Sequence, residues 1–194
     1  MAEVPSTFAL KPGESAPDFS LPDPDGTIHS LRDLIRGQKG LLIAFVCNHC
    51  PFVVHLAAEL GRFADSAAEQ GIATVAINAN DVSRYPADSP ALMKDFSTRN
   101  GWHFPYLYDE DQSIAKVYAA ACTPDFYLFD AALHLTYAGQ FDSTRPGRGG
   151  APTGEDLKTA VAHLLAATPM PTPWYPSTGC SIKWKPGSEP SYFG

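Results

Sequence analysis

The chain has 194 residues and a formal net charge of −7, with 44% hydrophobic and 18% charged residues. A chain of this length can form a domain with a buried core. Its net negative charge argues against nucleic acids and anionic membranes as partners, because both bind clustered Lys and Arg. The sequence contains no apolar run near the ~20 residues of a membrane-spanning helix. Its first residues lack the basic start and apolar core of a secretory signal, so we expect a cytoplasmic protein.

The elements expected in the first half of the chain are a hairpin, two buried strands and three helices. Turn signals, continuous apolar runs and helical spacing of apolar residues define them. In chain order they are a hairpin at 19–21 and 27–29 with Asp25-Gly26 in its turn, a short helix capped by Ser30, a strand at 41–46, a helix at 52–68, a strand at 72–77 and a helix at 90–99.

The second half adds three strands and two helices, followed by a Pro-rich tail. The expected elements are a strand at 104–108, a helix at 111–120 with an acidic N-cap, a hairpin of strands at 126–130 and 133–137, and a helix at 154–167. Strands that alternate with helices before a final hairpin and helix indicate an α/β protein with a mixed sheet. We expect residues 1–167 to form one domain and the tail, 168–194, to pack on it, because its five aromatic residues are atypical of a free linker.

Two cysteines separated by two residues, Cys47 and Cys50, stand between the strand at 41–46 and the helix at 52–68. A helix N-terminus lowers the pKa of a thiol, and this spacing allows the two thiols to form a disulfide. We therefore predict a redox dithiol in which Cys47 is the exposed attacking thiolate and Cys50 is the buried resolving thiol. His49 lies between them and is expected to stabilise the thiolate.

Three motifs carry a resemblance to a known family: Pro12-Gly13-Glu14-Ser15-Ala16-Pro17-Asp18-Phe19-Ser20-Leu21, Phe45-Val46-Cys47-Asn48-His49-Cys50-Pro51-Phe52 and Cys122-Thr123-Pro124-Asp125-Phe126. They resemble the peroxiredoxin-like branch of the thioredoxin fold, the alkyl hydroperoxide reductase and thiol-specific antioxidant redoxins. The resemblance implies a three-layer α/β/α fold, with a central mixed sheet and an N-terminal β-hairpin extension. It also implies that Pro124 is cis, and that His49, Thr123 and Pro124 contact the substrate.

The chain also departs from the motifs of its two best-known relatives. Peroxiredoxins carry a Thr three residues before the peroxidatic Cys, where this chain has Ala44, and an Arg just before the cis proline, where it has none. Thioredoxins carry a buried acid six residues before the first Cys, where this chain has Leu41. The sequence therefore carries the complete motif of neither a peroxiredoxin nor a thioredoxin.

The other two cysteines have open roles. Cys122 is either a third active-site thiol or a small apolar residue at a helix–strand junction. Cys180 lies in the tail and either exchanges disulfides with Cys47 or Cys122, or is buried as packing. A metal site formed by Cys47, His49, Cys50 and Cys122 is the alternative to redox chemistry, but the chain has no second CxxC to complete a closed zinc site, so no metal is predicted.

The function predicted from these residues is thiol–disulfide oxidoreduction by Cys47 and Cys50. A disulfide-containing protein or a small thiol would be the substrate, and thioredoxin or glutathione the electron donor, because no pattern for a nicotinamide or flavin cofactor is present. Two alternatives remain: a thiol-dependent peroxidase with an antioxidant role, and a non-catalytic metal-binding or redox-sensing protein. The oligomeric state, including a homodimer, is open.

Overall fold

The computed structural model describes residues 3–193. Its elements, in chain order, are β1 (Glu3–Pro5), β2 (Ser20–Pro22), β3 (Ile28–Ser30), α1 (Leu31–Ile35), β4 (Gly40–Phe45), α2 (Pro51–Glu69), β5 (Ile72–Asn78), the 3₁₀ turn η1 (Pro86–Asp88), α3 (Pro90–Arg99), β6 (Tyr106–Tyr108), α4 (Ser113–Val117), β7 (Cys122–Thr123), β8 (Asp125–Asp130), β9 (Leu135–Gly139), α5 (Glu155–Leu165) and β10 (Thr178–Ser181). The hairpin β2–β3 precedes the core, as predicted.

The central sheet has five strands in the order β6-β5-β4-β8-β9. β4 and β5 run parallel, as do β5 and β6, whereas β8 is antiparallel to both β4 and β9. The predicted mixed direction is therefore confirmed. All six residues of β4 are buried, which explains why its sequence is continuously apolar rather than alternating.

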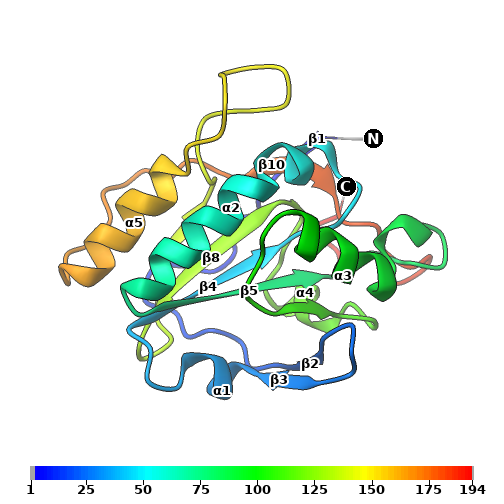
Figure 1. The fold of residues 1–194 in the computed structure, drawn as a ribbon, viewed down its shortest axis with the longest axis horizontal. Helices are drawn as coiled ribbons and strands as arrows, with labels where there is room; N and C mark the ends of the chain where they lie inside the picture. The colour runs from blue at the N-terminus through cyan, green and yellow to red at the C-terminus, as the bar shows by residue number, and fades with distance from the viewer. Residues whose placement is uncertain (1–2, 194) are drawn as a thin grey trace.

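Alternate residues of β4 supply two separate hydrophobic cores. Leu42 and Ala44 face α2 and α5, whereas Leu41, Ile43 and Phe45 face the hairpin, α1 and α4. Figure 1 shows α2 and α5 lying along one side of the sheet, with α1 and the hairpin on the other. The result is three layers, helices on both sides of a sheet, as expected for a sheet whose central strands are apolar on both faces.

The longest helix, α2, follows the dithiol. Its apolar side chains recur at helical spacing and are buried against the sheet, and Pro51 occupies its first turn, where the missing N–H costs nothing. Across residues 3–193, none of the helices combines the length and the apolar character that crossing a bilayer requires.

Several predicted boundaries differ from the structure by two or three residues, and for two of the starts the backbone shows the cause. Gln112 adopts a left-handed conformation, with φ of 64°, so the helix begins at Ser113 instead of residue 111. The buried carboxylate of Asp109, rather than Asp111, accepts the free N–H groups of Ile114 and Ala115. Leu133, with φ of 63°, belongs to the turn before β9 and not to the strand.

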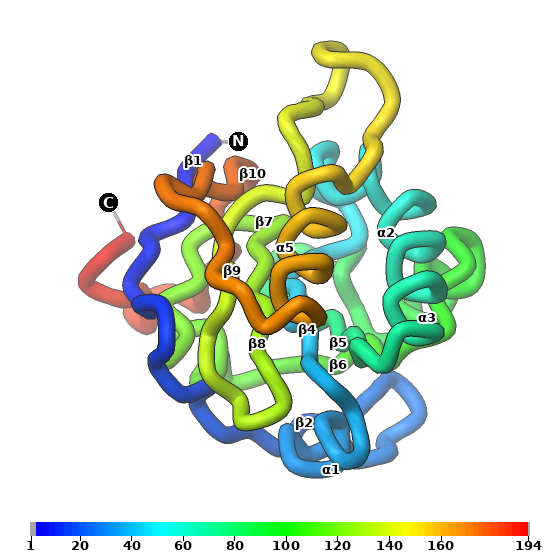
Figure 2. Tube along the Cα trace, turned by 90° about the vertical axis from the view of Figure 1, so that its left-hand side faces the viewer, coloured from blue at the N-terminus to red at the C-terminus, as the bar shows by residue number. Residues whose placement is uncertain are grey.

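The C-terminal segment contributes a strand and core side chains. β10 lies between β1 and β7 in a small antiparallel sheet, and Figure 2 shows β1 and β10 side by side near the N-terminus. Beyond β10, Ile182 and Trp184 are buried in the second core. The segment therefore closes the end of the molecule at which the dithiol lies.

Candidate functional site

The dithiol lies at the carboxyl end of β4, between strand and helix as predicted. Cys50 is the N-cap of α2, whereas Cys47 precedes the helix by a full turn. Both thiols are buried, with exposed fractions of 1% for Cys47 and 0% for Cys50. The prediction that Cys47 is exposed is therefore wrong. Its sulfur lies 3.5 Å from the hydroxyl of Thr123 and 4.0 Å from His49 Nδ1, and these side chains cover it.

The thiol with the lowered pKa is Cys50, at the N-cap of α2, and not Cys47. A hydrogen bond from Cys47 lowers the pKa of Cys50 to about 5, against the effect of burial, and the N–H of Val53 in the first turn of α2 contributes. When protonated, Cys50 donates to the carbonyl of Thr123 at 3.1 Å. The pKa of Cys47 is raised by its hydrogen bond to Cys50, by burial and by the nearby carboxylate of Asp88. The two thiols therefore differ in acidity, with the pKa of Cys50 lowered and that of Cys47 raised.

A buried carboxylate that the sequence analysis missed, Asp88, holds the loop between the two cysteines. Its Oδ1 accepts the backbone N–H groups of Asn48 at 2.8 Å and His49 at 3.2 Å. Its Oδ2 lies 2.7 Å from His49 Nδ1 and accepts from Asn80 Nδ2 at 2.8 Å. Burial opposes the charge, but these hydrogen bonds, those from His49 and Asn80 first, keep the pKa of Asp88 below its ordinary value.

The end of β5 fixes the position of Asp88. The side chain of Asn78 donates to the Asp88 carbonyl at 2.7 Å, and the side chain of Asn80 links Asp88 to the backbone N–H of Lys183. Asn78 and Asn80 stand at the carboxyl end of β5, and ligands and functional groups gather at the carboxyl ends of such strands. That position was the only available signal, because nothing in the sequence around Asp88 distinguishes it from a surface acid.

His49 is held by Asp88 and stacks on Tyr85, with ring centroids 5.8 Å apart. The hydrogen bond to Asp88 raises the pKa of His49, against the effect of burial. Cys47, His49 and Asp88 bring potential ligand atoms within 4.8 Å of one another, a set that differs from the predicted one because it contains Asp88 in place of Cys50 and Cys122. Nδ1 of His49 and Oδ2 of Asp88 bind each other, so a metal would have to displace that bond.

The Thr123–Pro124 peptide bond is cis, as the resemblance implied. The carbonyl of Thr123 accepts a hydrogen bond from the Cys50 thiol, and Thr123 is paired with Cys180 of β10. The predicted contact between the Thr123 backbone and a substrate strand therefore meets an obstacle, because the tail of the same chain already occupies that strand position.

The two remaining cysteines lie on opposite sides of the strand pair β7–β10. Cys180 is buried in the core cluster that contains Cys47 and Cys50, and Cys50 is one of the groups that shift the pKa of its thiol upward, after burial. This neighbour differs from the two considered in the sequence analysis. Cys122 is also buried, but its sulfur contacts the Pro124 carbonyl at 3.5 Å, and burial raises its pKa.

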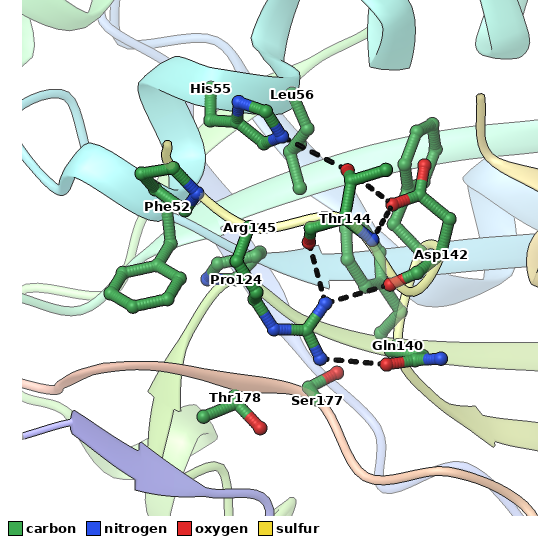
Figure 3. A pocket seen from close by; sticks show the side chains of 13 residues that line it. Phe52, His55, Leu56, Pro124, Gln140, Asp142, Thr144, Arg145, Ser177 and Thr178 are labelled. Atoms are coloured by element: carbon green, nitrogen blue, oxygen red, sulfur yellow. Dashed lines mark hydrogen bonds between the residues drawn. The ribbon is translucent and has the colours of Figure 1, made fainter. Parts of the chain in front are cut away.

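A hollow of about 290 Å³, counting its open mouth, lies beside the cis proline. Figure 3 shows Phe52 and Pro124 at one side of it and the loop after β9 at the other. Thr144 joins His55 to Asp142, and Arg145 reaches Gln140 at 2.7 Å, so this loop is tied down although its tip is exposed. The hollow gives the surface nearest the cis proline an apolar wall with one cationic side chain.

Comparison with known proteins places these features in a family. The model of the AhpC/TSA family matches residues 12–138. Among curated proteins, peroxiredoxin Bcp of Escherichia coli K12 is 30% identical over 55% of this chain and 63% of its own length. Thiol-disulfide oxidoreductase ResA of Geobacillus thermodenitrificans is 28% identical over 63% of this chain and 65% of its own length. The match thus spans a little under two thirds of each of these two relatives.

Solved structures agree on the fold. An uncharacterized conserved protein from Geobacillus kaustophilus is 47% identical, with a TM-score of 0.92 over 96% of this chain and 98% of that one. Peroxidoxin BcpB of Mycobacterium tuberculosis is 18% identical, with a TM-score of 0.61 over 81% of this chain and 97% of that one, and it supports the fold alone. The predicted thioredoxin-like fold is confirmed.

Proposed function

Because the chain belongs to the AhpC/TSA family of thiol-based redoxins, we propose that it is a thiol–disulfide oxidoreductase whose redox centre is the Cys47–Cys50 pair. One observation carries the proposal: two buried thiols at the N-terminus of α2 both contact Thr123, the residue before a cis proline, Cys47 at its hydroxyl (3.5 Å) and Cys50 at its carbonyl (3.1 Å). A thiolate in contact with a second thiol is the arrangement that thiol–disulfide exchange requires.

The first step joins Cys47 to the substrate. The Cys50 thiolate accepts the proton of Cys47, the Cys47 sulfur attacks one sulfur of the substrate disulfide, and the other substrate sulfur leaves as a thiolate. In the second step Cys50 attacks the Cys47 sulfur of the mixed disulfide and gives its proton to the departing substrate thiolate. The products are the Cys47–Cys50 disulfide and a reduced substrate, and an external dithiol or glutathione reverses the change.

Asp88 and His49 position the dithiol in this scheme. The carboxylate binds the two backbone N–H groups between the cysteines and so fixes the loop that must stay in place during exchange. Its negative charge also keeps the proton on Cys47 until Cys50 removes it. The hollow beside Pro124 adjoins the site, since Phe52 lies in the first turn of α2 and Thr178 begins β10, and both line it.

The test is a redox titration of the protein in dithiothreitol and glutathione buffers, with alkylation of free thiols and mass spectrometry of all four cysteines. We expect one two-electron Cys47–Cys50 couple, lost in Cys47→Ser and Cys50→Ser and retained in Cys122→Ser. A potential near about −270 mV would indicate a reductant and one of about −120 to −180 mV an oxidant or isomerase. If the pair never closes, the proposal fails.

A second candidate, thiol-dependent peroxidase, is favoured by one contact. The hydroxyl of Thr123 lies 3.5 Å from the Cys47 sulfur, where it can replace the missing motif threonine at position 44 as a hydrogen-bonding group for a bound peroxide. In this reaction peroxide would oxidise Cys47 to a sulfenic acid, and Cys50 would condense with it and release water. Steady peroxide consumption coupled to reduced thioredoxin, slowed in Thr123→Val, would support it, and consumption no faster than that of a free thiol would exclude it.

A further inference from the structure

The proposed function uses two of the three thiols that meet at this end of the molecule. β10 is antiparallel to β7, with Cys180 opposite Thr123 and Ser181 opposite Cys122. Residues directly opposite each other share a face of a strand pair, and neighbours along a strand alternate. The hydroxyl of Thr123 contacts Cys47, so Cys180 lies on the face of the dithiol and Cys122 on the other.

A glycine allows the close approach of β10 to the cis-proline segment. A Cβ at Gly179 would lie 2.0 Å from the carbonyl oxygen of Thr123, a separation that no side chain tolerates. The same carbonyl accepts from Cys50 on its dithiol side. Gly179 thus brings the next residue, Cys180, to the position opposite Thr123, the residue whose carbonyl accepts from Cys50.

Thr123 is the residue common to the three thiols: its hydroxyl contacts Cys47, its carbonyl accepts from Cys50, and Cys180 lies opposite it on β10. All three cysteines are at most 4% exposed, and all belong to the same buried cluster. Buried sulfurs in contact exchange disulfides without an external reactant, because attack, departure and proton transfer all take place among them.

We propose that Cys180 is a third redox thiol, which converts the Cys47–Cys50 disulfide into a Cys50–Cys180 disulfide. The proposal rests on the proposed function, which supplies the first disulfide. In the step, the Cys180 sulfur attacks Cys50, the Cys47–Cys50 bond breaks, and the proton of Cys180 passes to the departing Cys47 sulfur. The number of electrons does not change: one disulfide replaces another, and Cys47 is returned as a thiol.

The consequence is that the disulfide of the oxidised protein does not include the attacking cysteine, Cys47. With the disulfide at Cys50–Cys180, Cys47 is again able to form a mixed disulfide, for example with glutathione. Lys183, whose Nζ binds the Ser181 carbonyl at 2.6 Å, places a positive charge near Cys180 and opposes the effect of burial on its thiol. This charge favours the thiolate that must form during the exchange.

The test maps disulfides in the folded protein after oxidation with oxidised glutathione, acid quenching, alkylation and mass spectrometry. In Cys47→Ser we expect a Cys50–Cys180 disulfide, equally abundant in Cys47→Ser/Cys122→Ser and absent from Cys47→Ser/Cys180→Ser. Cys122 is the matched control because it is as buried as Cys180 but lies on the opposite face. Oxidised wild-type protein should also yield a fraction of the Cys50–Cys180 peptide, which tests the proposal without a substitution.

The outcomes separate the two proposals. If wild-type protein closes Cys47–Cys50 but Cys50 in Cys47→Ser is only glutathionylated and Cys180 stays reduced, the third-thiol proposal is overturned and the proposed function stands. If Cys47–Cys50 never closes even in Cys180→Ser, where no exchange can remove it, the proposed function fails and the exchange step is overturned with it. A Cys47→Ser protein with wild-type far-UV circular dichroism ensures that either result refers to the native fold.

Discussion

Replacing Asp88 by Asn tests whether the buried carboxylate fixes the dithiol loop. An Asn can keep its oxygen on the backbone N–H groups of Asn48 and His49 and thereby retain two of the four hydrogen bonds. The other two, at 2.7 and 2.8 Å, bring side-chain donors to the charged oxygen, and the Asn amide would face them instead. Hydrogen bonds to charged groups contribute about 1.5–3 kcal/mol each. After the relief from burying one charge fewer, we expect Asp88→Asn to destabilise the protein by about 2–4 kcal/mol.

Asp88→Asn should also lower the pKa of the Cys47 thiol. Because the Asp88 carboxylate is one of the groups that raise the pKa of Cys47, its removal should move the pH profile of Cys47 alkylation to lower pH. The stability difference should shrink in acid. The pKa of Asp88 is lowered by folding, so its contribution is complete above its ordinary value of 3.8 and is lost as the pH falls below it.

Urea unfolding at pH 7 and at pH 3.5 measures the first effect, and the rate of iodoacetamide labelling against pH measures the second. Asp95→Asn, at an exposed position of α3, is the matched control and should stay within about 0.5 kcal/mol of the wild type. Should Asp88→Asn match that control in stability and leave the labelling profile unshifted, Asp88 does not hold the loop, and the positioning role assigned to it is wrong.

Two further substitutions test buried groups near the site. Burial raises the pKa of Asp125 to about 7, so the contribution of its neutral form to stability is complete below pH 3.8 and is lost as the pH rises through 7. Asp125→Asn should therefore be more stable than the wild type by up to about 4 kcal/mol at pH 8.5, and nearly equal to it at pH 4. Urea titrations at the two pH values decide this, and parallel pH dependences of the two proteins would contradict it. Gly179→Ala should cost about 1–3 kcal/mol, because its Cβ cannot fit 2.0 Å from the Thr123 oxygen without moving β10. An unchanged thermal midpoint would argue against that close approach.

The sequence predicted those parts of the fold that depend on local pattern. The apolar runs at β4 and β5, the Asp25-Gly26 hairpin and the helical spacing of α2 each encode their element within a few residues. The boundary at Gln112 was missed because its left-handed backbone serves a tertiary contact: its side chain bonds to the carbonyls of Ala79 and Lys183. No window of sequence around residue 112 contains those partners.

The chemistry of the site was predicted less completely than its location. The spacing of Cys47 and Cys50 placed the dithiol correctly between β4 and α2, but it did not reveal which thiol caps the helix or that both are buried. Those properties depend on Asp88, 38 residues after Cys50, and on β10, whose Cys180 lies 130 residues after Cys50. Contacts at such separations leave no periodic signal in one sequence.

The strand position beside Thr123 is occupied by β10, and this has a consequence for substrate choice. A polypeptide that sought to pair with Thr123 would compete with a segment that the chain itself keeps within reach. A tethered competitor acts at a high effective concentration, on the order of millimolar, so it reduces the apparent affinity of any external strand that needs the same position. We therefore expect substrates that need little backbone pairing at Thr123 to react faster than extended polypeptides.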